Sequence, residues 1–135
     1  MAVPAGLRSE NKLEVLERAQ KYAIHIIEIT ANTKNFPGRF APIVTRMCDT
    51  AWEIAENIYT ANKVYIGDGA SQTAYKKREQ LQKRAVSGCN RLQFELNMAA
   101  KAFHLDNEWL VKNGAEVEAI RALVIAWKGS DRNMA

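Results

Sequence analysis

Residues 71–103 decide the fold of this 135-residue chain, and they read SQTAYKKREQLQKRAVSGCNRLQFELNMAAKAF. Apolar residues recur in this stretch every three or four positions, the spacing that places side chains on one face of an α-helix. The members of this face are Leu81, Ala85, Gly88, Cys89, Leu92, Leu96, Ala99 and Phe103. An unbroken helix of this length would extend about 50 Å at a rise of 1.5 Å per residue. The stretch therefore predicts one long amphipathic helix.

Helical periodicity continues on both sides of this stretch. It covers residues 11–33, the segment from near Arg39 to residue 63, and the segment from residue 106 to about residue 128. Loop-forming residues interrupt the pattern at 35–38 and at 66–70. Since no segment alternates polar and apolar residues as a strand would, we expect an all-α protein. Four long helices with short connections favour an antiparallel up-down-up-down four-helix bundle.

The expected bundle is a single domain of residues 11–129, with an N-terminal extension at 1–10 and a C-terminal tail at 130–135. Its apolar stripes are wide, and in the second helical segment Trp52 and Tyr59 broaden the inner face. A monomer of this size need not bury apolar residues on so many faces, so we expect a homo-oligomer. A well-packed monomer is the alternative explanation of the same stripes.

The composition is typical of a folded globular protein, with 47% hydrophobic and 25% charged residues. These proportions exclude disordered chains and low-complexity scaffolds. The longest apolar run, at 122–127, is much shorter than the roughly 20 residues that a membrane span needs. The first residues lack the basic and apolar regions of a secretion signal. Two cysteines are too few for a disulfide framework. We therefore expect a cytoplasmic protein.

Positive charge is concentrated in the long central helix. The chain has a net charge of +4 and a pI of about 9.2, whereas residues 71–101 hold seven Lys or Arg and two acids, a net charge of +5. A seven-residue spacing is nearly two helical turns, so residues that share it form one ridge. Two adjacent columns have this spacing: Lys77, Arg84 and Arg91, and Lys76, Lys83 and Asn90. Such a ridge fits a phosphate backbone or an acidic protein surface. The alternative is a solvated face that keeps the protein soluble.

Motifs for catalysis and cofactor binding are missing from the sequence. A di-iron bundle needs Glu-x-x-His on two helices, but the residues three positions before His25 and His104 are Tyr22 and Lys101. The loop at 66–70 lacks the Gly-Lys-Ser/Thr of a phosphate-binding loop. We therefore expect a protein without enzymatic activity, metal or other cofactor.

A family resemblance rests on the order of several sequence features. The first helix ends in Lys34-Asn-Phe-Pro37, and the second closes with Ile58-Tyr-Thr-Ala-Asn-Lys63. The run Tyr75-Lys-Lys-Arg-Glu-Gln-Leu-Gln-Lys-Arg84 follows, and the last helix ends in Trp127-Lys128. Over about residues 11–129 the chain resembles the four-helix-bundle family that includes the accessory variability determinant of diversity-generating retroelements. The same family holds proteins encoded in intervening sequences of large-subunit ribosomal RNA genes.

The resemblance implies a barrel-shaped homopentamer with a basic exterior and no enzymatic activity. Such a protein associates with a reverse transcriptase and template RNA and supports mutagenic complementary-DNA synthesis. The contact residues that the resemblance implies by position are Lys76, Lys77, Arg78, Lys83, Arg84 and Arg91. The alternative is a structural or adaptor homo-oligomer of the intervening-sequence type, with an acidic protein or ribosomal RNA as its partner.

Overall fold

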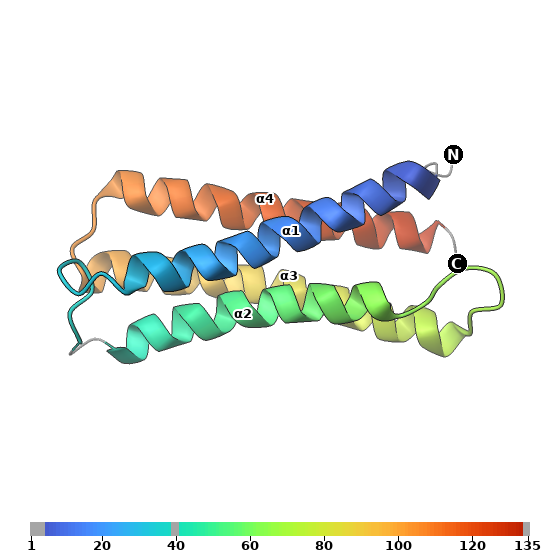
Figure 1. The fold of residues 1–135 in the computed structure, drawn as a ribbon, viewed down its shortest axis with the longest axis horizontal. Helices are drawn as coiled ribbons and strands as arrows, with labels where there is room; N and C mark the ends of the chain where they lie inside the picture. The colour runs from blue at the N-terminus through green and yellow to red at the C-terminus, as the bar shows by residue number, and fades with distance from the viewer. Residues whose placement is uncertain (1–4, 39–40, 134–135) are drawn as a thin grey trace.

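The protein is a four-helix bundle. A computed structural model describes residues 5–38 and 41–133, and these residues contain no strand. The helices are α1 (Ala5–Thr30), α2 (Ala41–Lys63), α3 (Gln72–Ala102) and α4 (Asn107–Arg132) (Figure 1). None of the described helices is both long enough and apolar enough to cross a membrane.

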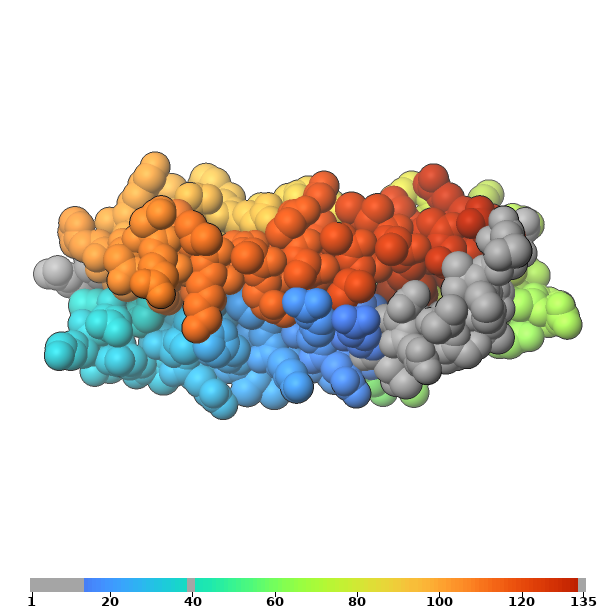
Figure 2. Space-filling view, turned by 90° about the horizontal axis from the view of Figure 1, so that it is seen from above, coloured from blue at the N-terminus to red at the C-terminus, as the bar shows by residue number. Residues whose placement is uncertain are grey.

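Each helix lies beside two others around one hydrophobic core. Helix α2 contacts α1 and α3, and α4 also contacts α1 and α3, so that α1 and α3 are diagonal to each other. The connections after α1 and after α3 lie at one end of the molecule, and the connection after α2 lies at the other end (Figure 1). Figure 2 shows α1 and α4 side by side along one long face. Because α1 lies diagonally across the core from α3, the face of α3 that points away from the core lies between α2 and α4.

Helix α3 has a definite start and a definite end. Ser71 is its N-cap, and the Ser71 Oγ accepts a hydrogen bond from the Ala74 N–H at 3.1 Å. At the other end His104 adopts a left-handed conformation with a φ of 54°, and the Leu105 N–H donates to the Ala100 carbonyl at 2.9 Å. This backbone pattern terminates a helix and satisfies one of its last carbonyls. These two ends confirm the long central helix that the sequence predicts.

Helices α2 and α3 approach each other closely at Gly88. A Cβ atom added to Gly88 would lie 2.7 Å from the Ile54 Cγ1, a distance that real Cβ contacts do not show. The missing side chain therefore allows Ile54 to fill the contact, and it fixes how deeply α3 sits against α2. Since Gly88 lies on the inner face of α3, the opposite face of the same turn is exposed to solvent.

The core contains most of the apolar positions expected for α3. Leu81, Ala85, Cys89, Leu92, Leu96 and Ala99 are all buried. Trp52 and Tyr59 differ from the expectation, because they are 57% and 48% exposed and lie outside the core. The wide stripe of α2 therefore extends beyond what one bundle covers.

The helix boundaries differ from the expected ones at both ends of the chain. Helix α1 begins at Ala5, so part of the segment expected as an N-terminal extension is helical. Helix α4 continues to Arg132 and buries Asp131, so the expected tail at 130–135 belongs in part to the bundle. The expected start of the second helix, near Arg39, lies outside the described residues, which resume in α2 at Ala41.

Candidate functional site

An exposed stripe runs along the outer face of α3, and we call it the outer stripe. Its members follow one another at spacings of three and four residues, so they share one side of the helix. They are Lys77, Gln80, Arg84, Ser87, Arg91, Phe94, Met98 and Lys101, all of them exposed. Four of these eight side chains are cationic and none is acidic. The ridge column Lys77, Arg84 and Arg91 therefore lies on one solvent-exposed face.

The second column borders α4. The Asn90 Oδ1 accepts a hydrogen bond from the Arg121 Nε at 3.0 Å, and the Lys83 Nζ lies 3.2 Å from the Glu79 Oε1. Lys76 and Lys83 are exposed beside the outer stripe. The structure thus brings together five of the six candidate contact residues on the surface of α3.

Arg78 is the exception, and its assignment as a surface contact is wrong. Its side chain is buried, with a residue exposure of 2%. The Arg78 Nε and Nη2 donate to the two carboxylate oxygens of Asp131 at 2.7 and 3.0 Å. The Arg78 Nη1 also donates to the Val64 carbonyl at 3.2 Å, and the guanidinium lies 4.9 Å from the centre of the Trp127 ring. With these partners inside the bundle, Arg78 has no free face for a partner molecule.

The burial of Arg78 follows from the sequence if the buried stripe of α3 is extended towards the N-terminus of the helix. Arg78 precedes Ala85 by seven residues, the same spacing that joins Ala85 to Leu92, and all three are buried. Its place is therefore on the inner face, where a charged side chain needs a partner. That partner, Asp131, lies 53 positions away in α4, and the sequence gives no sign of the pair.

Two of the exposed ridge cations, Lys83 and Arg91, form ion pairs within the protein. The Glu79 Oε1 lies 3.2 Å from the Lys83 Nζ and 3.0 Å from the Arg132 Nη2. Hydrogen bonds from Arg132 and Lys83 lower the pKa of the Glu79 carboxyl. The Arg91 Nη2 lies 2.6 Å from the Glu53 Oε2 on α2. These pairs are exposed, so water and salt screen them, and a partner's phosphate can compete for the cations.

Lys76, Lys77 and Arg84 have a different environment. None of the ion pairs among residues 14–38 and 41–133 involves these three side chains. All three are exposed, and they lie in the N-terminal half of α3. The positive potential of the ridge is therefore strongest in this half.

The C-terminal half of the ridge is more nearly neutral. Burial raises the pKa of the Glu95 carboxyl, while a hydrogen bond from Thr50 and the nearby charges of Arg91 and Arg46 oppose this effect. The Glu95 Oε1 is buried without a hydrogen-bond partner. Glu53 and Glu95 both lie near the Arg91 cation, whereas Lys76, Lys77 and Arg84 form no ion pair within the described residues.

A groove between α2 and α3 runs beside the ridge. It has a volume of about 370 Å³, and Lys83, Arg84 and Arg91 line its α3 side. Glu53 and Asn57 line its α2 side. The groove gives the ridge a polar flank, with side-chain donors and acceptors on both walls.

Two basic residues of α4 extend the ridge, and sequence reasoning missed them. Lys128 and Arg132 line a hollow of about 240 Å³ that also includes Lys76 and Tyr75 near the start of α3. These α4 residues lie more than 50 positions after Lys76 in the chain. Their proximity depends on how α3 and α4 pack, which no local sequence pattern encodes.

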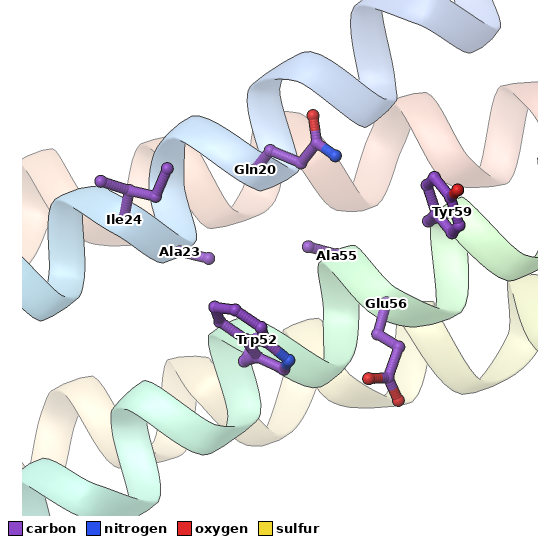
Figure 3. Close-up of a pocket in the computed structure, with 7 residues that line it drawn as sticks. All are labelled: Gln20, Ala23, Ile24, Trp52, Ala55, Glu56 and Tyr59. Atoms are coloured by element: carbon purple, nitrogen blue, oxygen red, sulfur yellow. The ribbon is translucent and has the colours of Figure 1, made fainter.

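An apolar hollow on the opposite side of α2 is the second notable surface. It has a volume of about 360 Å³ and lies between α1 and α2 (Figure 3). Ile24 from α1, and Trp52 and Tyr59 from α2, line it, and Ile24 is 54% exposed. Large exposed apolar side chains that cluster in this way are typical of an interface.

The described residues contain no cluster of three His, Cys, Asp or Glu side chains that could hold a metal ion. Burial raises the pKa of the Cys89 thiol to about 12, so this side chain is a neutral part of the core at physiological pH.

Comparisons with known proteins add no relative: no protein-family model, curated protein or solved structure matches the chain.

Proposed function

We propose that this chain is a non-enzymatic, cytoplasmic accessory protein that binds RNA through the outer face of α3 and supports a reverse transcriptase. The observation that carries the proposal is the outer stripe, with four cations and no acid among eight exposed positions. Five of the six residues implied by the family resemblance are exposed on or beside this stripe. Complementary DNA presents the same phosphates and is expected to bind in the same way.

The chemistry of the stripe suits a phosphate backbone. From Lys77 to Lys101 the stripe extends about 36 Å along the helix axis, which is long enough to follow several phosphates. Arg84 and Arg91 carry planar guanidinium groups that bind phosphate oxygens in pairs, and the lysines act as point charges. Contacts to phosphates position a nucleic acid without reading its bases. The proposed binding therefore depends on charge and shape.

The proposal includes an antiparallel, up-down-up-down order of the helices. Its support is the sequence of contacts between α3 and α4. Arg78 pairs with Asp131, Asn90 with Arg121, and Gln93 with Glu118. Residue numbers rise along α3 while they fall along α4, as in two helices of opposite direction. This order places Lys128 and Arg132 beside the strongly basic half of α3.

Self-association is the other part of the proposal, and the family resemblance suggests a pentamer. The apolar hollow between α1 and α2 supports it, because Ile24, Trp52 and Tyr59 are more exposed than a solvated surface favours. The hollow lies across α2 from the ridge. A homo-oligomer formed through α1 and α2 would therefore leave the α3 face of each copy free for RNA.

A charge-reversal variant tests the RNA-binding proposal. Lys76, Lys77 and Arg84 are changed together to Glu, because none of them makes an ion pair within the described structure. Binding of a fluorescently labelled RNA hairpin with single-stranded flanks is measured by anisotropy. We expect an affinity loss of more than about tenfold. The matched control changes Lys21, Lys34 and Lys112 to Glu, three exposed lysines away from α3. Equal affinities for the two triple variants would contradict the proposal.

A second candidate function is a structural or adaptor homo-oligomer whose ridge meets an acidic protein or ribosomal RNA. The pair between Arg91 and Glu53, at 2.6 Å, favours the acidic-protein version, because it shows how a ridge arginine accommodates a carboxylate. An adaptor of this kind retains an acidic protein partner at low salt and has no affinity for the RNA hairpin. The same triple variant releases that partner.

A further inference from the structure

The outer stripe contains a large aromatic side chain among its cations. Phe94 is 64% exposed, and Met98, four residues later on the same side of α3, is 47% exposed. Leu92 and Leu96, on either side of Phe94 in the chain, are fully buried. Phe94 therefore points away from the core, as Met98 does, whereas Leu92 and Leu96 belong to it.

Phe94 has no aromatic or cationic partner of its own in the described part of the chain. The ring contacts there join Tyr22 with His25, Phe36 with Phe103 and Trp109, and two cations with other rings. The Phe94 side chain, 64% exposed and without such a contact, is thus accessible to a ligand. An exposed aromatic ring carries an unfavourable hydration cost that a stacking partner removes.

The neighbours of Phe94 on the stripe are Arg91 on one side and Met98 on the other, and Lys101 follows Met98. Arg91 lies three residues before it, about 4.5 Å along the helix axis, and Arg84 lies about 15 Å away. The Arg91 guanidinium pairs with Glu53 of α2. A ligand that follows the stripe from Lys77 therefore meets three cations in succession and then an aromatic ring.

Single-stranded nucleic acid has the chemistry that matches this order. Proteins bind it with positive charge along the backbone and with aromatic rings on which unpaired bases stack. A duplex would satisfy the cations, but its bases are already stacked on one another and offer no free face to Phe94. A protein partner would prefer a larger apolar patch, whereas the exposed apolar surface of the stripe is limited to Phe94 and Met98, which lie between Arg91 and Lys101.

We infer that the α3 face binds a single-stranded segment of RNA, with phosphates along Lys77, Arg84 and Arg91 and one unpaired base stacked on Phe94. This inference rests on the proposed RNA binding and names the form of RNA that the same surface takes. Stacking on Phe94 adds affinity that does not depend on salt, whereas the phosphate contacts supply the salt-dependent part.

The test compares the full-length protein with its Phe94→Ala, Phe94→Leu and Phe94→Tyr variants. The probes are a labelled single-stranded RNA 12-mer, its duplex with the complementary strand, and a 12-mer of the same backbone without bases. We expect Phe94→Ala and Phe94→Leu to weaken single-strand binding about 5- to 100-fold. Phe94→Tyr keeps the aromatic face and the affinity. None of the variants changes binding of the abasic strand, and Ile27→Ala, on the diagonal helix α1, changes no affinity.

The outcomes separate the inference from the proposed function. Wild-type protein that binds none of the three probes at low salt overturns both. Binding that is equal for wild type and Phe94→Ala overturns the stacking inference and leaves RNA binding in place. A loss with Phe94→Ala that is the same on all three probes also overturns it, because a stacked base cannot account for lost affinity to an abasic strand. Loss of reverse-transcriptase retention by Phe94→Ala, with RNA binding unchanged, assigns Phe94 to a protein contact instead.

Discussion

The guanidinium of Arg78 and the carboxylate of Asp131 form a buried two-point pair, with N···O distances of 2.7 and 3.0 Å. This pair joins the first turns of α3 to the last turn of α4, and Gln82 adds a third donor to the same carboxylate at 2.7 Å. Arg78 is thereby committed to the interior, while Lys76 and Lys77 beside it remain exposed. Of these three consecutive cations, Arg78 thus stabilises the interior, whereas Lys76 and Lys77 belong to the surface.

Breaking the buried pair is expected to destabilise the bundle strongly. The substitution Asp131→Ala leaves the Arg78 charge buried without its partner, which costs about 3–5 kcal/mol. Replacing both residues by apolar ones, as in Arg78→Met with Asp131→Leu, should recover most of this loss. Urea unfolding followed by circular dichroism measures both. The control is Arg132→Ala, which removes an exposed pair with Glu79 and should cost less than about 1 kcal/mol. Equal losses for Asp131→Ala and Arg132→Ala would contradict the structural role of the buried pair.

Alanine substitutions at Gly88 and at Gly114 are expected to have opposite effects on stability, because only Gly88 lies against another helix. Gly88→Ala places a Cβ against Ile54 and should destabilise the protein by about 1–3 kcal/mol. Gly114→Ala meets no atom within 4 Å in the interior of α4 and should stabilise it by about 0.5–1 kcal/mol. Thermal unfolding distinguishes the two variants. Ile54→Ala removes the Cγ1 that the new Cβ would meet, so Gly88→Ala should cost less stability in an Ile54→Ala background than in the wild type, and an equal cost would place the conflict elsewhere.

The buried thiol of Cys89 predicts a loss of stability in alkaline solution. Burial raises its pKa from 9.0 to about 12, so the folded protein keeps a proton that the unfolded chain releases. This contribution is constant well below pH 9. As the pH rises from 9 towards 12, it falls by on the order of 1 kcal/mol per pH unit. Urea unfolding between pH 7 and pH 11 measures the slope. Cys89→Ala should have a flatter pH dependence, and identical slopes would show that another group is responsible.

The apolar hollow between α1 and α2 predicts the effect of placing charge in it. Trp52→Glu combined with Tyr59→Glu should convert the proposed homo-oligomer into a 15.2-kDa monomer that remains helical. Light scattering coupled to size-exclusion chromatography measures the mass. Val111→Glu, at an exposed apolar position of α4, serves as the control and should leave the oligomer intact. A monomeric wild type would contradict self-association through this surface.

The sequence predicts the number of helices and the extent of the central one, because local periodicity determines them, whereas α1 begins earlier and α4 ends later than expected. The predicted long helix at 71–103 corresponds to α3 at Gln72–Ala102, and its buried stripe is the predicted one. Trp52 shows the limit of the same reasoning. Every apolar residue of a wide stripe has the sequence pattern of a core residue. Only the packing of the helices shows which edge of the stripe is buried and which edge is exposed.

The candidate site is predictable where it lies on one helix and not where it spans two. Lys77, Arg84 and Arg91 share a face because their spacing is seven residues, and the structure exposes all three. Arg78 differs because its burial depends on Asp131, and Lys128 joins the surface only through the packing of α4 against α3. The surroundings of Arg78 and Lys128 thus depend on contacts between residues that are far apart in the chain, and local sequence patterns do not encode such contacts.

The salt dependence of RNA binding tests the central proposal most directly. The labelled hairpin with single-stranded flanks is titrated with wild-type protein at several salt concentrations between 50 and 300 mM. If five exposed ridge cations each neutralise one phosphate, the logarithm of the association constant falls with the logarithm of the salt concentration at a slope of about −3.5 for single strands. The variant in which Lys76, Lys77 and Arg84 become Glu should bind weakly at every salt concentration. A wild-type slope near zero, or no binding at 50 mM salt, would contradict RNA binding by the α3 face.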